Sequence, residues 1–383
     1  MNKICEKKKC TGCFACFNIC PKNAIKMIED DFGRIYPIID EDKCINCGLC
    51  KKTCPQLNDV KYNEPITAYA LYNKDKKIRN DSTSGGAATT FYLKVLESGG
   101  IIYGANNIEN ERFKFIRITN QSDLYKVKGS KYVHCYIDNM FLKVQEDLKN
   151  NNQVLFIGTP CQIAGLKLFL KKEYENLLTV DLICHGVPTQ KFLNDELKLH
   201  VKDTNLISSV KFRDGSSKVF IIEKNDNNCI YKESWDTNYY LYRFLNSMIF
   251  RENCYECKYA KKQRVSDITI GDFWGLKSQN KYFKDDKKGI SLVMPNTEKG
   301  KYFVEKCLRD VIYEERPLDE AINGNSQLQL PAKKHKNYNK FFKYYKKFGY
   351  EKACKKTRTF KQHLKQVKII SNIYHRIKGR KYE

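Results

Sequence analysis

One cysteine motif occurs twice near the start of this 383-residue chain. Cys10-x2-Cys13-x2-Cys16-x3-Cys20-Pro21 returns 34 residues later as Cys44-x2-Cys47-x2-Cys50-x3-Cys54-Pro55. Two-residue gaps let the first three thiolates of a run face one four-iron cluster, and the fourth is directed to the other cluster. The sequence therefore predicts two crossed 4Fe–4S sites, with Cys10, Cys13, Cys16 and Cys54 in one and Cys44, Cys47, Cys50 and Cys20 in the other.

Zinc binding and a small disulfide scaffold are the alternatives, and two complete runs, each ending in proline, disfavour both. Between the runs, Ala24–Glu29 and Gly33–Ile38 alternate around an acidic turn and predict a hairpin beside the clusters. The segment resembles bacterial two-cluster ferredoxins. Cys5 lies outside the motif, and we interpret it as a spare thiol rather than a ligand.

The amino-acid composition of the whole chain indicates the number of domains and the cellular location. The 42% hydrophobic content can form a core, and the length suggests two or three domains. No run of 18 apolar residues predicts a membrane span, and the first residues lack the apolar stretch of a secretory signal. We therefore expect a cytoplasmic protein whose 17 cysteines are reduced thiols serving metals.

The net charge of +25 is concentrated at the C-terminal end. Residues 333–383 hold 18 Lys and Arg against two acids, with aromatic residues between them. A helical tail with a solvated charged face is the first interpretation. Contact with an anionic membrane surface or an acidic protein is the second, and nucleic acid is disfavoured because no recognised motif accompanies the basic residues.

Two features of the middle region suggest ligand sites. The small-residue loop Ser82–Thr90 leads into an apolar-periodic helix, which indicates either an anion site at a helix start or a serine-capped turn. Two cysteines, Cys161 and Cys184, follow consecutive strand patterns, and such strand ends meet at one sheet edge. They fit two buried free thiols or a metal site.

A later Cys-x2-Cys pair supplies what a third site would need. Cys254 and Cys257 suit half a zinc site, a redox dithiol or half an iron–sulfur site. Joined with the two strand-end cysteines, they predict a third four-cysteine site made of Cys161, Cys184, Cys254 and Cys257.

The motif order is more specific than any single motif. The two cysteine runs are followed by Ser82-Thr83-Ser84-Gly85-Gly86, Gly129-Ser130-Lys131-Tyr132, Gly158-Thr159-Pro160-Cys161-Gln162, Cys184-His185-Gly186-Val187-Pro188, the Cys-x2-Cys pair and Gly271-Asp272-Phe273-Trp274-Gly275. Over roughly residues 1–330 this order resembles the coenzyme F420 hydrogenase/dehydrogenase beta-subunit family, in its bacterial form with a fused N-terminal ferredoxin.

The resemblance implies FAD beside at least one 4Fe–4S cluster, which would be the third cysteine set. It also implies the residues lining the flavin: Ser84, Gly85, Gly86, Ala87, Thr89, Ser130, Lys131, Gly158, Thr159 and Pro160. His185 and His134 are candidate acid–base groups, and either also fits a structural histidine. The substrate is not specified by these motifs.

We therefore expect an oxidoreductase that passes electrons from ferredoxin, or another low-potential donor, through the clusters to FAD and an organic substrate. The alternative is a non-catalytic electron-transfer subunit that docks to a hydrogenase or dehydrogenase. The expected organisation is a dicluster ferredoxin domain at 1–60, a mixed α/β flavin-binding core at 61–330, and a basic helical tail at 331–383. Through that tail the protein could be membrane-peripheral.

Overall fold

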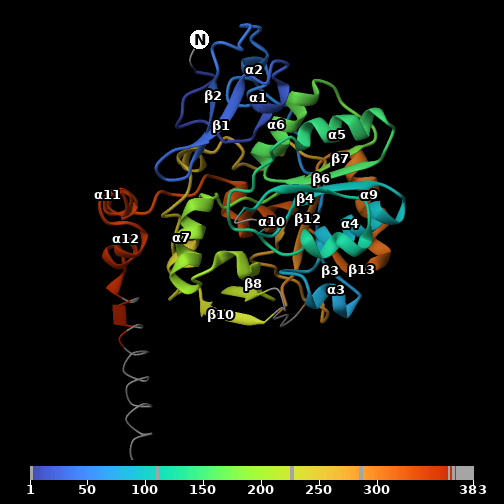
Figure 1. Ribbon diagram of the computed structural model, residues 1–383. Coiled ribbons are helices and arrows are strands. Elements are labelled where there is room, and N and C mark those ends of the chain that lie inside the picture. Colours follow the sequence, from blue (N-terminus) through green and yellow to red (C-terminus); the bar gives the residue numbers. More distant parts are fainter. Residues whose placement is uncertain are drawn as a thin grey trace, which may run out of the picture.

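The structure is a computed structural model that describes residues 3–108, 112–224, 228–283 and 288–360, together with 363, 364 and 367. Its centre is a mixed eight-stranded sheet (Figure 1). Across the sheet the strands are β13 (Val311–Arg316), β3 (Ala68–Asn73), β12 (Ser291–Pro295), β11 (Ile268–Asp272), β7 (Leu177–Leu182), β6 (Val154–Gly158), β4 (Ile101–Ala105) and β5 (Phe115–Ile118).

Strand direction decides where the loops gather. β4, β6, β7 and β11 pair in parallel, and β3 runs the same way because two antiparallel pairings separate it from β11. β5, β12 and β13 run in the opposite direction. The carboxyl ends of β3, β4, β6, β7 and β11 therefore lie at one edge, where open α/β sheets collect ligands.

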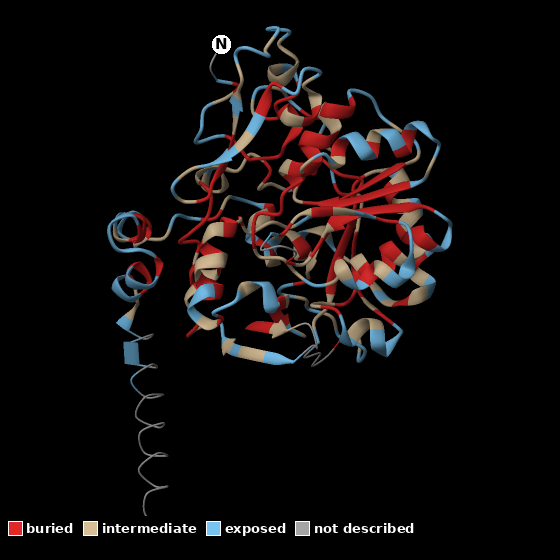
Figure 2. Ribbon diagram, in the orientation of Figure 1, coloured by how far each residue is buried: buried red, intermediate tan, exposed pale blue. Residues whose placement is uncertain are grey.

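Both faces of the sheet are covered, which explains the nearly continuous apolar strands. In β6, Val154 and Phe156 face one core, with α5 (Met140–Lys149) and α6 (Pro160–Leu170). Leu155 and Ile157 face the other core, with α4 (Ala87–Glu97) and α9 (Glu298–Cys307). Figure 2 shows these central strands buried.

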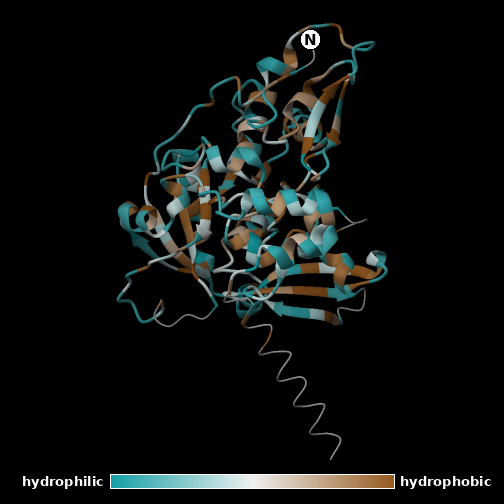
Figure 3. Ribbon diagram, turned by 90° about the vertical axis from the view of Figure 1, so that its left-hand side faces the viewer, coloured by the Kyte–Doolittle hydropathy of each residue, from teal (hydrophilic) through white to brown (hydrophobic). Residues whose placement is uncertain are grey.

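The N-terminal region lies at the end of the molecule beside α6 (Figure 1). It holds α1 (Ala15–Ile19), the hairpin β1 (Ile25–Glu29) and β2 (Ile35–Ile39), and α2 (Leu49–Lys52). The hairpin confirms the predicted antiparallel pair. Figure 3 shows its apolar stretches at the end of the molecule that carries the N-terminus.

The sequence did not anticipate the second sheet, whose antiparallel order is β10-β9-β8. Its strands are β8 (Ile207–Asp214), β9 (Ser217–Lys224) and β10 (Cys229–Ser234), and they pack with α7 (Gln190–His200) and α8 (Tyr239–Leu245). The remaining α-helices are α3 (Lys76–Asn80), α10 (Leu318–Gly324), α11 (Tyr338–Phe348) and α12 (Tyr350–Lys356). Across the described residues, none of the helices is long and apolar enough for a membrane crossing.

The described part of the tail is a packed element rather than a solvated appendage. The aromatic face of α11 is buried: the ring of Phe342 lies 4.9 Å from that of Phe32 and 5.7 Å from that of Phe192 in α7. Tyr345 donates a hydrogen bond to Asp195 at 2.5 Å. The exposed lysines of α11 agree with the solvated charged face of the first interpretation, whereas the aromatic face of this helix is already occupied. The rest of the predicted tail, residues 361, 362, 365, 366 and 368–383, lies outside the described residues.

Candidate iron–sulfur centres and cofactor loops

Two cavities in the N-terminal region are each lined by one predicted ligand set. Cys10, Cys13, Cys16 and Cys54 line what we term the inner cavity, together with Cys5 and Pro55. Cys20, Cys44, Cys47 and Cys50 line the outer cavity. Each cavity thus receives three cysteines of one run and the fourth of the other run.

The backbone shows why the repeat forms two similar loops. Gly12 and Asn46, at equivalent positions of the runs, both have positive φ values, of 64° and 54°. Phe14 and Gly48 are also equivalent, with φ values of 62° and 72°, and they precede the short helices α1 and α2. Left-handed residues reverse the chain locally. The paired reversals wrap each run around its cavity.

The two cavities differ in their surroundings. Cys47 of the outer set is exposed, whereas the four cysteines of the inner set are buried. Cys13 lies against α6, so that a Cβ on Gly165 would come within 3.0 Å of its Sγ. Gly165 follows Cys161 by about one helical turn. The inner set and the third set therefore meet at the surface of α6.

The four cysteines of the third set come from three segments. Cys161 lies in the first turn of α6, which begins at a capping box between Thr159 and Gln162. Cys184 follows the end of β7, and Cys254 and Cys257 lie in and directly after the 3-10 helix η3 (Glu252–Glu256).

The structure brings these four thiols into electrostatic contact with one another. Burial, with a smaller contribution from neighbouring cysteines of the set, raises the pKa of Cys184 and of Cys254 to about 12. The pKa values of Cys161 and Cys257 are also raised, mainly by burial. Within the described ranges, no three Cys, His, Asp or Glu residues close on a point that a single metal ion could occupy.

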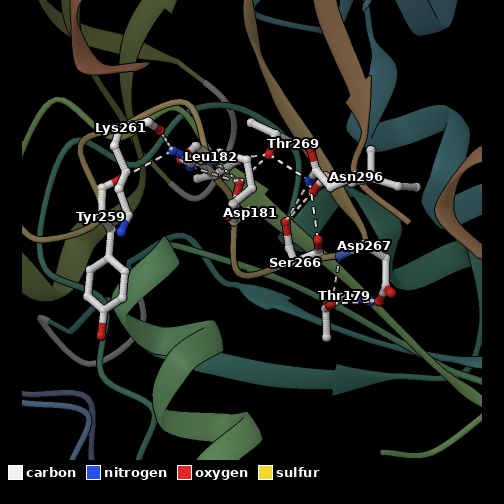
Figure 4. A network of polar contacts seen from close by, with 11 residues as sticks. Thr179, Asp181, Leu182, Tyr259, Lys261, Ser266, Asp267, Thr269 and Asn296 are labelled. Carbon is white, nitrogen blue, oxygen red and sulfur yellow. Dashed lines mark hydrogen bonds and ion pairs between the residues drawn. The ribbon is translucent and has the colours of Figure 1, made fainter. Parts of the chain in front are cut away.

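A buried polar network holds the segment that follows Cys257 (Figure 4). Arg264 donates to Asp181 of β7 at 2.9 Å and to the carbonyl of Tyr259 at 3.1 Å. Thr269 of β11 donates to the same Asp181 carboxylate at 2.7 Å. The buried ion pair and its hydrogen bonds fix the Cys257–Arg264 loop relative to the sheet.

The predicted flavin loops lie at the same carboxyl edge. The segment around Ser84 follows β3, and Thr83 Oγ1 lies 3.0 Å from Ser130 Oγ, which joins it to the Gly129–Tyr132 loop. Ser84 Oγ is buried without a hydrogen-bond partner. Lys131 is half-buried, and the burial of its amine lowers its pKa to about 7, while its Nζ donates to the carbonyl of Lys128 at 2.6 Å.

The glycine pair has a structural reason of its own. A Cβ on Gly85 would lie 2.1 Å from the carbonyl oxygen of Leu71 in β3 and 2.7 Å from the amide of Ser291 in β12. Gly86 has a φ of +89° and precedes α4. Both positions therefore require glycine to close the turn onto the sheet, whatever the loop binds.

The other predicted flavin residues lie at the start of α4 and at the junction of β6 and α6. Ala87 and Thr89 lie in the first turn of α4, and both are buried. Gly158 ends β6, and Thr159 and Pro160 open α6. Thr159 Oγ1 lies 3.2 Å from Cys161 Sγ. This last group is placed directly beside the third cysteine set.

Comparison with known proteins decides the family. Two family models, described as "Coenzyme F420 hydrogenase/dehydrogenase, beta subunit", match the chain: the N-terminal one over residues 68–141 and the C-terminal one over residues 151–321. The chain belongs to the coenzyme F420 hydrogenase/dehydrogenase beta-subunit family. Residues 9–58 and 36–93 match 4Fe-4S dicluster domains, so this member carries an iron–sulfur region ahead of the part that defines the family.

Several individual proteins resemble this family member. A coenzyme F420-dependent sulfite reductase of Methanocaldococcus jannaschii is 26% identical over 58% of this chain and 38% of its own length. An uncharacterized protein of the same organism is 21% identical over 85% of this chain and 95% of its own. A chain of the F420-reducing [NiFe] hydrogenase complex from Methanosarcina barkeri is 18% identical, with a TM-score of 0.47 over 77% of this chain and 91% of that one. Together, the beta-subunit and dicluster models show that this chain is an iron–sulfur member of the family.

In this beta-subunit relative, the two candidate histidines occupy packed positions. His134 is buried against Gly12, whose added Cβ would lie 2.8 Å from the imidazole Cε1. Burial and the charge of Arg251 hold the pKa of His134 well below its usual range. His185 packs between the rings of Phe244 and Phe250, and burial lowers its pKa as well. Both imidazoles are therefore neutral at pH 7.

Arg251 is the site residue that sequence reasoning missed. It is 1% exposed, and its Nη2 donates to the carbonyls of Cys10 at 3.1 Å and Ile35 at 3.0 Å. Its Nε and Nη1 are buried without partners. Burying an unpaired guanidinium costs free energy. The position of Arg251 beside the inner cavity therefore fits an anionic, thiolate-bound cluster there. Its position next to the Cys-x2-Cys pair was the available signal.

Proposed function

We propose that this chain is an iron–sulfur flavoprotein oxidoreductase that passes electrons from a ferredoxin-type donor to an organic substrate. Three 4Fe–4S clusters would be held by the inner, outer and third cysteine sets. FAD would be held at the carboxyl edge by the Ser84 and Lys131 loops. Bound there, FAD would convert single electrons into two-electron chemistry on the substrate.

The observation that carries the proposal is the order of the three cysteine sets. The outer set includes the exposed Cys47, the inner set is buried, and Cys13 of the inner set packs on the helix that bears Cys161. The third set lies at the strand ends beside Thr159. This order supports a path from the protein surface to the sheet edge.

The surface around the outer cavity supports an acidic electron donor. Lys22 lines this cavity and is exposed, and Ile45 beside it is 58% exposed. An exposed lysine beside an exposed apolar residue suits a transient contact with a small acidic protein. The donor would dock there rather than on the α11 aromatic face, which is already buried.

Substrate identity follows from the site only as a class. The half-buried Lys131 and the Ser84 hydroxyl, which has no hydrogen-bond partner, offer polar contacts for the flavin, while the neutral histidines lie elsewhere. A reducible organic molecule would therefore reach FAD at the carboxyl edge. A screen of electron acceptors would identify that molecule and the direction of electron flow.

The first test is anaerobic purification with iron, sulfide, zinc and flavin measured on one sample. We expect about twelve irons and one FAD per chain. About twelve irons without flavin would overturn the flavoprotein part and leave an electron-transfer subunit that docks to a partner enzyme. Zinc in place of about four irons would overturn the third cluster.

A second test uses Lys131, because its lowered pKa predicts a proton change. In the flavin-free protein at pH 8 the amine is mostly neutral, since its pKa is about 7. A flavin phosphate beside it would favour the charged form. Calorimetry in buffers of different ionisation enthalpy should therefore show proton uptake on FAD binding.

The variant Lys131→Met is the control for this proton uptake. It should bind FAD more weakly and without the uptake, and Ser84→Ala should weaken binding but keep the uptake. Equal proton uptake in wild type and Lys131→Met would remove Lys131 from the flavin site. Gly85 is avoided as a test position because the fold itself requires glycine there.

A further inference from the structure

The inner cavity has one more thiol than a four-iron cluster needs. Cys5 lines it together with Cys10, Cys13, Cys16 and Cys54. The Cys5 side chain lies within hydrogen-bond reach of both the Cys10 and the Cys54 thiols. The sequence motif excluded Cys5 because it stands five residues before the first run. Only folding brings it to the cavity wall.

We propose that Cys5 is a substitute ligand of the inner cluster, able to take the place of Cys10 or Cys54. The inference rests on the proposed function only in requiring a cluster in that cavity. Ligand exchange would replace the iron–sulfur bond of Cys10 or Cys54 by one iron–sulfur bond from Cys5. The thiol proton of Cys5 would pass to solvent. No electron is transferred, so no oxidant or reductant is needed.

The local structure allows such an exchange. Ile4 is 5% exposed and packs with Cys16, Ile25 and Cys54, which anchors the segment at the cavity. From Cys5 to Cys10 the chain makes a turn, in which the amide of Cys10 donates to the carbonyl of Glu6 at 3.1 Å. A turn adjusts more easily than a strand or helix. Cys5 can therefore shift toward a vacated position without disturbing the sheet.

The reach of Cys5 sets its specificity. Its contacts are with Cys10 and Cys54, whereas Cys13 packs against Gly165 on the α6 side. Cys5 should therefore replace the missing ligand when Cys10 or Cys54 is mutated, but not when Cys13 is mutated. This selectivity separates a specific ligand exchange from a general tolerance of the inner cluster to mutation.

The outer cavity is the internal control. Among the residues that the structure describes, its wall carries four cysteines and no fifth. Cys20 is the repeat equivalent of Cys54, and Cys44 is the equivalent of Cys10. A serine at either outer position meets no substitute thiol. The repeat thus supplies matched pairs of variants that differ in the presence of Cys5.

The experiment compares Cys54→Ser, Cys20→Ser, Cys5→Ser and the double variant Cys5→Ser/Cys54→Ser, all purified anaerobically. Iron and sulfide are quantified, and electron paramagnetic resonance spectra are recorded after reduction. Cys54→Ser should keep about twelve irons with an altered inner-cluster signal, whereas Cys20→Ser should lose about four. The double variant should lose about four, and Cys5→Ser alone should lose none.

Two outcomes would overturn the inference. One is a loss of about four irons in Cys54→Ser, matching Cys20→Ser. The other is full iron retention in the double variant, which would mean that serine or water serves instead of Cys5. A wild-type protein without the inner cluster would fail differently, because it would overturn the cofactor assignment before any variant is compared.

Discussion

The inner and outer cavities come from the same repeat but lie in different environments. The outer cavity has an exposed cysteine and the exposed Lys22, while the inner cavity has buried cysteines, a buried arginine and contact with α6. Spacing fixes the four motif cysteines that each cavity receives. The packing around a cavity then determines which role its cluster can serve. The comparison teaches that two equal motifs can place one cysteine set at the surface and the other in the interior.

The sharpest test of this difference is the pair Cys13→Ser and Cys47→Ser. Each should remove about four of twelve irons, because each cubane loses one of four thiolates. The thermal midpoint should fall further for Cys13→Ser, since Cys13 packs against α6 and the exposed Cys47 does not. Iron analysis and calorimetry measure both effects. Equal losses of thermal stability in the two variants would contradict the distinction between the inner and outer cavities.

A smaller effect is expected from Arg251→Met. Its buried positive charge beside Cys10 favours the reduced, more negative form of the inner cluster. Removing that charge should shift the midpoint reduction potential of the inner cluster to a more negative value and leave the iron content unchanged. Redox titration followed by electron paramagnetic resonance measures this shift.

The matched control for Arg251 is Lys22→Met at the outer cavity. Lys22 is exposed, so solvent and salt screen its charge and the outer potential should move less. A larger shift in Lys22→Met than in Arg251→Met would show that burial does not separate the two cavities electrostatically.

The smallest predicted effect concerns Tyr259. It is 3% exposed, its hydroxyl is buried without a partner, and its electrostatic neighbours include Cys161 and Cys13. Figure 4 shows it pointing away from the polar network. Hydrogen bonds to cluster sulfurs raise reduction potentials. We expect Tyr259→Phe to lower the potential of the inner or third cluster and to leave the outer cluster unchanged.

Tyr62→Phe serves as the control for that variant. The Tyr62 ring lies 6.4 Å from that of Tyr259, but its hydroxyl already donates to the carbonyl of Lys258. The same redox titration should show no change of cluster potential in Tyr62→Phe. A shift of the outer potential in either variant would indicate a general disturbance of packing.

Local patterns in the sequence predicted the regular elements well. The hairpin predicted over Ala24–Glu29 and Gly33–Ile38 forms as β1 and β2, and the predicted strand ends at Cys161 and Cys184 lie at one sheet edge. Alternation and strand–cysteine adjacency are local signals, so they could be recognised. The three-stranded sheet of β8, β9 and β10 was missed, although β9 contains the continuous apolar run Val219–Ile222.

The tail shows the limit of composition as a guide. Its aromatic and basic residues suggested a surface for solvent, lipid or protein. The structure instead buries Phe341 and Phe342 against α7 and the β1–β2 turn and leaves many of the lysines outside. Hydropathy predicted the apolar face correctly but could not name its partner, which comes from elements distant in the chain.

The sequence by itself determined the two crossed cysteine sets, the strand-end positions of the third set and the family. Each depends on spacing along the chain or on a local periodicity. The tertiary structure alone decided that Cys5 joins the inner wall, that Arg251 reaches the Cys10 carbonyl, and that Cys13 meets α6. Except for the nearby Cys5, these contacts join residues far apart in sequence. Their geometry exists only after the ferredoxin-like region packs on the sheet.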